Sequence, residues 1–265
     1  MNATTPVRRM TECAIMIALA AVLSFVKLAD LPAGGSITLG SMLPIVLIAY
    51  RHGWRWGTLA GVVHGTIQLL VGMSVFAYVT SWRAAVAVVL LDYVVAFGAI
   101  GLAGVFRRGG RDDAKALVFG ALLAAAVRYL CHVVSGATVW AGLSIPTEAA
   151  LWYSIAYNAT YMIPETLVLV VLAAYLGGAL TLGGDEITRR VRKKAALRWQ
   201  TLVAGALCAG AVTFDTVTVF SRLQGADGTF DVTALAAVNW IPVAAVTGAA
   251  AVLSAVLLDF SKKRG

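Results

Sequence analysis

The sequence is poor in charged residues. Only 13% of its 265 residues are Asp, Glu, Lys or Arg, whereas 60% are hydrophobic. Soluble domains usually carry about 25% charged residues, so this composition excludes a disordered chain and argues strongly against a soluble globular fold. A membrane-spanning helix needs about 20 apolar residues, which leaves room for about six to nine such helices. We therefore predict an all-α, polytopic membrane protein.

Cysteine, histidine and the common catalytic motifs are also scarce. Cys13, Cys131 and Cys208 lie in apolar runs without paired spacing, which is typical of small buried side chains rather than of disulfides or a zinc site. The three histidines are scattered at different predicted depths, so we expect no metal site. The sequence has no phosphate-binding loop of the form G-x-x-x-x-G-K-[ST], no H-E-x-x-H and no G-x-S-x-G. We expect no cofactor and no ATP hydrolysis by this chain itself.

Long apolar runs, by contrast, are abundant. They predict eight helices, over residues 10–29, 37–50, 56–79, 84–106, 115–141, 149–181, 199–221 and 232–260. The second helix is short: at 1.5 Å per residue it covers about 21 Å, less than the hydrocarbon thickness of about 30 Å. The connection before it, residues 30–40, contains Pro32, Gly34 and Gly35, which indicates an irregular loop.

The basic residues orient these helices. With the N-terminus in the cytoplasm, most of the 21 Lys and Arg residues fall in cytoplasmic segments, as the positive-inside rule requires. Only Lys27, Arg83 and Arg222 fall outside, and Arg128 lies within a helix. We predict that both termini are cytoplasmic. The net charge of +8 is then mainly topological, and we expect no nucleic-acid partner.

A basic stretch marks a boundary late in the chain. Residues 182–198 hold six basic residues and separate the first six predicted helices from the last two. We predict a six-helix substrate-binding membrane domain over residues 1–181, a cytoplasmic linker over 182–198 and a two-helix extension over 199–265. Asp215, in the extension, has no explanation from the sequence.

Polar residues within the predicted spans point to a binding site. Ionisable groups are costly in a membrane, so each is a functional hypothesis. Counted from the outer helix ends at 1.5 Å per residue, Asp92, His132 and Asn158 all lie about 12–14 Å deep, and Arg128 lies one turn deeper. Four polar residues from three helices at this depth predict a pocket that opens to the outer side rather than a continuous channel.

Aromatic residues accompany these polar groups. Tyr93 follows Asp92, and Trp140 continues the four-residue spacing that begins at Arg128. Aromatic walls with a few convergent polar groups are typical of a small-molecule site, and a carboxylate among aromatic rings suits a cationic ring. Gly136 lies on the same stripe as Arg128, His132 and Trp140, and Tyr153 and Asn158 lie on the following helix.

Structural roles compete with this interpretation. Arg128 and Asp92 would suit an ion pair within the membrane, and His132 would suit a hydrogen bond to a neighbouring helix. His64 lies deeper on its helix, and we interpret it as a packing contact. Glu165 also lies below the predicted pocket, where an interhelix contact is expected.

Four blocks of the first six helices carry a family resemblance. They are RMTECAIMIALAAVLS at residues 9–24, PIVLIAYRHGWRWGTLAGVVHG at 44–65, LLDYVVAFGAIGLAGVFRR at 90–108, and VRYLCHVVSGATVWAG at 127–142 with WYSIAYNA at 152–159. They resemble the ThiT family, the thiamine-specific substrate-binding subunit, or S-component, of energy-coupling factor (ECF) ABC transporters. The last two blocks are the specific ones.

The resemblance implies a function and a set of residues. It implies capture of thiamine at the outer face of a bacterial plasma membrane, with ATP-driven uptake through a transmembrane coupling subunit and two ATPase subunits. The family's A-x-x-x-A patch, which docks the coupling subunit, matches Ala14 and Ala18. Its site motifs match Asp92 with Tyr93, Arg128 with His132, Gly136 with Trp140, and Tyr153 with Asn158. The resemblance implies that these eight residues bind the substrate.

The chain also departs from the family. The family commonly has Glu at the position of Asp92, Lys at Arg128 and Trp at His64, and it has no counterpart of the last two helices. Another vitamin, or a pyrimidine precursor of thiamine, is an alternative ligand. A membrane enzyme that uses Asp92, Arg128 and His132 on a lipid-linked substrate is an alternative of another class. An ion-coupled carrier is disfavoured because no inverted repeat is visible.

Overall fold

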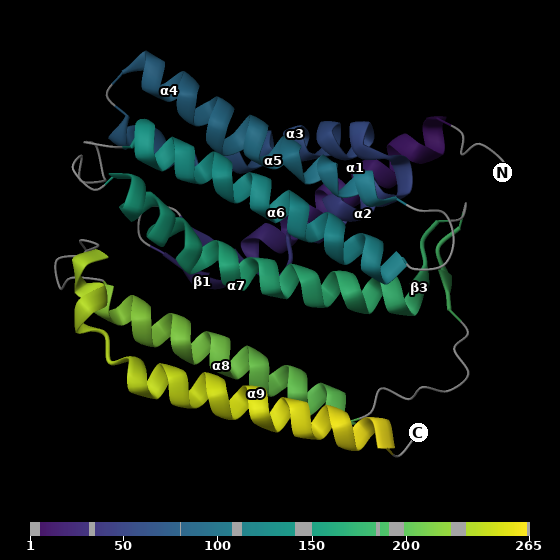
Figure 1. Cartoon of the computed structure of the whole chain (residues 1–265). Helices are drawn as coiled ribbons and strands as arrows, with labels where there is room; N and C mark the ends of the chain where they lie inside the picture. Colours follow the sequence, from purple (N-terminus) through teal and green to yellow (C-terminus); the bar gives the residue numbers. More distant parts are fainter. Residues whose placement is uncertain are drawn as a thin grey trace. The chain divides into compact units, whose positions relative to one another are not determined.

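The chain folds into two compact units, Met1–Arg190 and Val191–Gly265 (Figure 1). A computed structural model describes residues 6–31, 35–79, 81–107, 113–140, 150–183, 186–190, 199–223 and 232–263. Helices dominate both units, and the two small sheets in the described residues have two strands each. The predicted all-α membrane fold is confirmed.

The first unit contains six successive helical segments. They are α1 (Pro6–Phe25), α2 (Leu43–His52), α3 (Trp54–Val71) followed by the 3₁₀ helix η2 (Met73–Tyr78), a composite helix over Trp82–Phe106, α6 (Asp113–Thr138) and α7 (Ala150–Ala179). The composite helix comprises α4 (Trp82–Val88), the π-helix η3 (Val89–Val95), α5 (Ala96–Gly98) and the 3₁₀ helix η4 (Ala99–Phe106). Helix α6 packs between α7 and the composite helix (Figure 1), and this places the three helices that carry the predicted pocket side by side.

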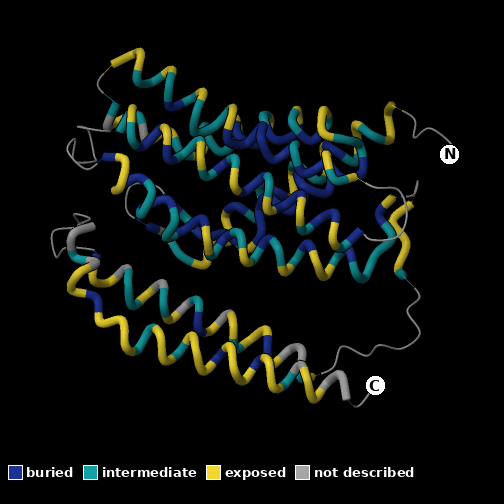
Figure 2. The backbone as a smooth tube through the Cα atoms, in the orientation of Figure 1, coloured by how far each residue is buried: buried dark blue, intermediate teal, exposed yellow. Residues whose placement is uncertain are grey.

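Five helices are long and apolar enough to cross a membrane, counted over the described residues. They are Trp82–Phe106, Asp113–Thr138 and Ala150–Ala179 in the first unit, and Val203–Leu223 and Trp240–Leu257 in the second. Helix α2 is a shorter apolar helix, as its sequence predicted. Its residues Ile45, Val46 and Ala49 are fully buried, so this helix belongs to the core of the unit rather than to its lipid-facing surface. Figure 2 shows the same concentration of buried positions inside the first unit.

The connection predicted as an irregular loop is partly ordered. Strand β1 (Lys27–Asp30) pairs antiparallel with β2 (Ser36–Thr38), and Ala29 lies opposite Ile37. The prediction of an irregular loop over residues 30–40 was therefore wrong for its second half. Strands of three and four residues are too short for alternation of apolar and polar residues to reveal them in the sequence. Pro32 and Gly34 lie outside the described residues.

One end of the first unit carries a network of ionic contacts. Asp113 accepts hydrogen bonds from Tyr50 at 2.5 Å and from Arg190 at 2.7 Å, and Arg51 pairs with Glu12 at 3.1 Å. These contacts join α1, α2, α6 and the segment after strand β4 (Thr188–Arg189), which pairs with β3 (Leu180–Thr181). The basic residues at this end therefore have a structural role in addition to the predicted topological one.

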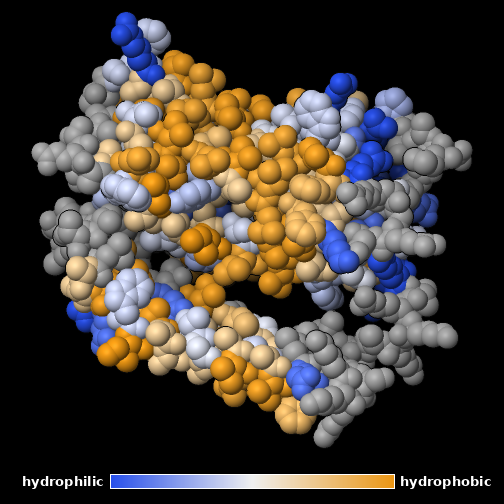
Figure 3. Space-filling model, viewed as in Figure 1, coloured by the Kyte–Doolittle hydropathy of each residue, from blue (hydrophilic) through white to orange (hydrophobic). Residues whose placement is uncertain are grey.

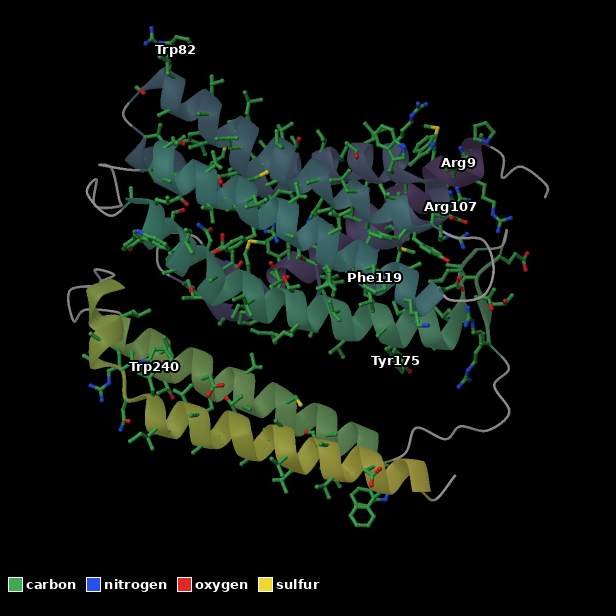
Figure 4. The ribbon with its side chains drawn as sticks, viewed as in Figure 1. Arg9, Trp82, Arg107, Phe119, Tyr175 and Trp240 are labelled. Atoms are coloured by element: carbon green, nitrogen blue, oxygen red, sulfur yellow. The ribbon has the colours of Figure 1, made fainter. Side chains whose placement is uncertain are left out.

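The two ends of the first unit differ in character. Arg9 and Arg107, both predicted to be cytoplasmic, lie at the same end, whereas Trp82 lies at the opposite end (Figure 4). Apolar residues cover the middle of the visible face of this unit, and hydrophilic residues gather toward its ends (Figure 3). An apolar band between polar ends is the surface that a bilayer requires. The assignment of the basic end to the cytoplasm stays a prediction.

Glycines bring α3 into direct contact with the composite helix. A Cβ atom added at Gly61 would lie 2.2 Å from the carbonyl oxygen of Phe97, and one at Gly65 would lie 2.4 Å from that of Tyr93. Only glycine permits backbones to approach this closely. His64 lies next to Gly65 on this face and is fully buried.

The second unit contains η6 (Val232–Ala237) and the helix pair α8 (Trp199–Leu223) and α9 (Trp240–Lys263). Most of its described positions are exposed or intermediate (Figure 2). Polar groups within this pair bond to each other: Thr247 donates to Asp215, and Ser254 donates to the carbonyl oxygen of Ala204. Asp215, which the sequence left unexplained, is thus one side of an interhelical hydrogen bond.

Candidate ligand-binding site

The carboxylate of Asp92 is the centre of the candidate site. One oxygen accepts a hydrogen bond from His132 Nδ1 at 2.8 Å. The other accepts from Ser135 Oγ at 2.6 Å and from Trp140 Nε1 at 3.3 Å. The sequence predicted that Asp92 and His132 share one depth in the membrane and that Trp140 lies on the same stripe of its helix as His132. In the structure, His132 and Trp140 both bond to Asp92.

A local change of helix type places Asp92 in this position. Asp92 lies in the middle of η3, the π-helical segment Val89–Val95, and the segment before η3, α4, is α-helical. A π-helix has more residues per turn than an α-helix, and this changes the direction of the side chains that follow. Such segments are frequent at functional sites. The sequence predicted a regular helix over residues 84–106 and gave no indication of this π-helix.

Ser135 is a further residue of the candidate site that was not predicted from the sequence. It lies three residues after His132 on α6, so both side chains occupy the same helix face, and it is fully buried. The i, i+3 spacing from His132 was the signal available in the sequence. Gly136, which was predicted, is buried on the same stretch of α6.

Aromatic rings of α7 form a second part of the site. The rings of Tyr153 and Tyr157 stack with centroids 6.3 Å apart. Tyr161 donates a hydrogen bond to Asn158 Oδ1 at 2.6 Å, and its ring lies 6.5 Å from that of His132. Tyr153 and Asn158 therefore lie on the α7 side of the site, and Tyr161 connects them to His132.

Tyr93 has a different neighbour from Asp92. Its ring stacks on that of Phe97 with centroids 6.5 Å apart and an interplanar angle of 9°. Consecutive helical residues point in different directions, so Tyr93 does not take part in the hydrogen bonds of the Asp92 carboxylate. Phe97 was not among the predicted site residues, yet its ring also contacts His64 and Arg128.

Arg128 pairs with Glu165 and not with Asp92. Its Nη1 lies 2.8 Å from Glu165 Oε2, and Glu165 is only 2% exposed. Thr38 donates to the other oxygen of Glu165 at 2.7 Å. The Arg128–Asp92 ion pair considered from the sequence is therefore not formed. Arg128 pairs with Glu165, whereas Asp92 accepts a hydrogen bond from His132. Glu165 makes the interhelix contact expected of it.

The β1–β2 hairpin lies over the aromatic residues of α7. The backbone N–H of Gly35 donates to the hydroxyl of Tyr157 at 3.0 Å. A Cβ atom at Gly35 would lie 2.7 Å from Tyr161 Cδ1, so the hairpin backbone rests directly on these rings. At its other end, the hairpin is fixed by Thr38 to Glu165.

The predicted docking residues occupy a separate surface. Ala14 and Ala18 are both exposed on α1, and the large apolar residues Ile15, Leu19 and Val22 beside them are exposed as well. This surface does not include the Asp92 carboxylate or its hydrogen-bond donors.

Comparisons with known proteins agree with this architecture. The family model for "Thiamine transporter protein" matches residues 10–181. The chain is 36% identical over 188 residues to thiamine transporter ThiT of Bacillus subtilis (strain 168), which covers 66% of this chain and 93% of that protein. It also matches a solved structure of ThiT from Listeria monocytogenes, with 27% identity and a TM-score of 0.54 over 64% of this chain and 93% of that one.

These findings confirm the resemblance and set the membrane-enzyme alternative aside, because the relatives are named as transporters. Together with the long apolar helices, they identify a multi-pass protein of the bacterial cell membrane. The matched region of the family model spans most of the first unit. The chain belongs to the thiamine transporter family.

Proposed function

We propose that this chain is the S-component of an ECF transporter and binds thiamine at the Asp92 site. Thiamine enters from the end of the first unit that carries Trp82, which is predicted to be external. Its transport inward depends on a transmembrane coupling subunit and two ATPase subunits. The names of the relatives support thiamine as the ligand.

The charge state around Asp92 carries the proposal. Among the ion pairs of the described residues, Asp92 is joined only to His132, while Arg128 is neutralised by Glu165. Thiamine contains a thiazolium ring with a permanent positive charge. Burial of such a charge is costly unless an anion compensates it. In the described residues Asp92 has no recorded ion pair with Lys or Arg, so its carboxylate suits this purpose.

The surrounding residues suit a flat, cationic ligand. Trp140 is held beside Asp92 by its indole N–H, so an aromatic face and a carboxylate lie next to each other. A cation over an aromatic face is attracted by the ring electrons. Tyr153 and Asn158 add an aromatic ring and an amide from α7.

Removal of the Asp92 charge tests the proposal. We expect Asp92→Asn, which keeps the shape but not the charge, to weaken thiamine binding by about 2–5 kcal/mol, the range for a buried charge left unpaired. Asp92→Glu restores the charge and has the residue common in the family, so it should bind thiamine nearly as the wild type does. Calorimetric titration of purified protein in detergent measures all three dissociation constants.

A neutral pyrimidine precursor of thiamine is the matched ligand control. It lacks the thiazolium charge, so its affinity should change little in Asp92→Asn. If Asp92→Asn binds thiamine as tightly as wild type does, Asp92 does not compensate a cation. If the precursor binds the wild type more tightly than thiamine does, the precursor becomes the preferred ligand.

The proposed coupling rests on α1. Ala14 and Ala18 are small, exposed and four residues apart, and small residues at this spacing allow another helix to approach closely. They lie on a surface separate from the Asp92 hydrogen bonds, so partner binding and ligand binding should be separable by mutation.

A further inference from the structure

His64 is a buried polar residue whose ring nitrogens make no recorded hydrogen bond in the described residues. It is 0% exposed, and within the described part of the chain neither of its ring nitrogens has a hydrogen-bond partner. Its only ring contact recorded there is an edge-to-face contact with Phe97, with centroids 5.4 Å apart. The packing role expected from the sequence accounts for the ring but not for its nitrogens.

Such a residue is costly to the empty protein. Nearly all buried polar groups in native proteins are hydrogen-bonded, and an exception requires an explanation. An apolar side chain would make the same contact with Phe97 without leaving a donor and an acceptor unpaired. The imidazole is therefore expected to gain partners in another state of the protein.

The neighbours of His64 connect it to the Asp92 site. The guanidinium of Arg128 lies 4.8 Å from the centroid of the Phe97 ring that His64 contacts, and Arg128 Nε is also buried without a partner among the described residues. Tyr93 stacks on the same ring. His132, which bonds to Asp92 through Nδ1, leaves its buried Nε2 unpartnered in the described structure.

These unpartnered nitrogens belong to residues of α3 and α6. They lie between Asp92 and the end of the first unit that carries Arg107. Phe97 follows Asp92 by five residues, a rise of about 7 Å along a helix. Because Arg128 is neutralised by Glu165, the region around Phe97 offers hydrogen bonds without a net charge. It therefore suits a neutral polar group and not an anionic one.

We propose that His64 is a specificity-determining residue. Its imidazole exchanges hydrogen bonds with a neutral polar group of the substrate, separate from the charged ring of the substrate. The inference rests on the proposed function. A neutral imidazole offers one donor and one acceptor. Thiamine has two neutral groups that match: the aminopyrimidine edge, with an amine donor and ring-nitrogen acceptors, and the hydroxyl of its hydroxyethyl chain.

The test compares apo stability with ligand affinity in the same variants. His64→Leu and His64→Phe both remove the unpaired nitrogens, and His64→Leu does so without added bulk. We expect the melting temperature of ligand-free protein to stay equal or rise in at least one of them. We also expect thiamine affinity to fall about tenfold or more, because the substrate loses hydrogen bonds that the site was built to make. His64→Gln, which keeps a donor and an acceptor, should lose less.

Val63→Leu is the matched control, because Val63 is the adjacent residue of α3 and is exposed; it should change neither measurement. Two thiamine analogues identify the group that His64 contacts. One has the amine replaced by an oxo group, and the other lacks the hydroxyl. The analogue that has lost the contacted group should bind wild type more weakly than thiamine does, but bind His64→Leu about as well as thiamine does.

The outcomes separate this inference from the proposed function. Wild-type protein that binds no thiamine overturns both. Wild-type protein that binds thiamine, with His64 variants that bind it equally well, overturns the inference alone. A lower melting temperature in both apolar variants, with unchanged affinity, would show that His64 serves the fold.

Discussion

Two carboxylates in the first unit have opposite surroundings, and this contrast explains their different roles. Asp92 accepts from His132, Ser135 and Trp140, whereas Glu165 is paired with the guanidinium of Arg128. A carboxylate that faces a buried guanidinium is neutralised within the protein. Glu165 therefore joins α6 and α7 through Arg128, and we propose that Asp92 meets a positive charge on the ligand.

Trp140 gives the first test at this scale. If its indole ring lies against the thiamine rings, addition of thiamine should quench tryptophan fluorescence. Trp140→Ala should weaken binding by about 1–3 kcal/mol, the scale of aromatic and cation–π contacts. Trp82, which is 73% exposed, provides the control: Trp82→Ala should bind thiamine normally. An unchanged dissociation constant in Trp140→Ala would remove Trp140 from the site.

The Arg128–Glu165 pair predicts a stability effect. Glu165→Leu leaves the guanidinium of Arg128 buried without its counter-ion and should lower the free energy of unfolding by about 3–5 kcal/mol. Addition of Arg128→Met should recover most of this loss, because the unpaired charge is then gone. Thermal unfolding of ligand-free protein in detergent measures both. Equal losses in the single and double variants would contradict a mutual ion pair.

The sequence predicted much of the site because depth along a helix can be counted. Asp92 and His132 were placed at one level by the rise per residue, and they are in contact. Depth does not give the direction of a side chain around the helix, so the sequence left open an Arg128–Asp92 ion pair, whereas Arg128 pairs with Glu165. Ser135 was missed although its i, i+3 spacing from His132 was available as a signal, and Phe97 was missed because a phenylalanine in an apolar run carries no signal of its own.

At the scale of elements, apolar length predicted the helices well and local irregularity poorly. All eight predicted helices correspond to helical segments, because a run of about 20 apolar residues has few other stable forms in a membrane. The π-helix around Asp92 and the β1–β2 hairpin were not predicted. The hairpin makes tertiary contacts, such as the bond from Gly35 to Tyr157, which no local pattern encodes.

Helix α1 is the element whose predicted role is coupling. Ala14→Trp or Ala18→Trp would hold a partner helix away from the exposed surface of α1, where small residues allow close contact. We expect uptake of thiamine to be abolished in cells that contain the partner subunits, while the purified variants bind thiamine as wild type does. Val171→Trp, at an exposed position of α7, should leave uptake intact. Loss of binding together with uptake would show that α1 is part of the ligand site.

At the scale of the whole molecule, the match to the family ends near the boundary between the units. The family model covers residues 10–181, and the first compact unit ends at Arg190. Residues 182–190 complete that unit, because Arg190 bonds to Asp113 and the backbone N–H of Leu182 bonds to the same carboxylate. All the proposed ligand-binding residues lie in this unit, whereas the polar groups of α8 and α9 bond to each other.

This division predicts that thiamine binding does not require the second unit. A chain that ends at Arg190 keeps the Asp113 contacts and every proposed ligand-binding residue. Its thiamine dissociation constant should stay within about twofold of that of the full chain, because groups without shared partners contribute independently. A chain that ends at Thr181 is the informative comparison: it loses the Arg190 contact and should unfold at a lower temperature. If the chain ending at Arg190 folds but binds thiamine about tenfold more weakly, a loss of about 1.4 kcal/mol, then α8 and α9 contribute to the ligand site.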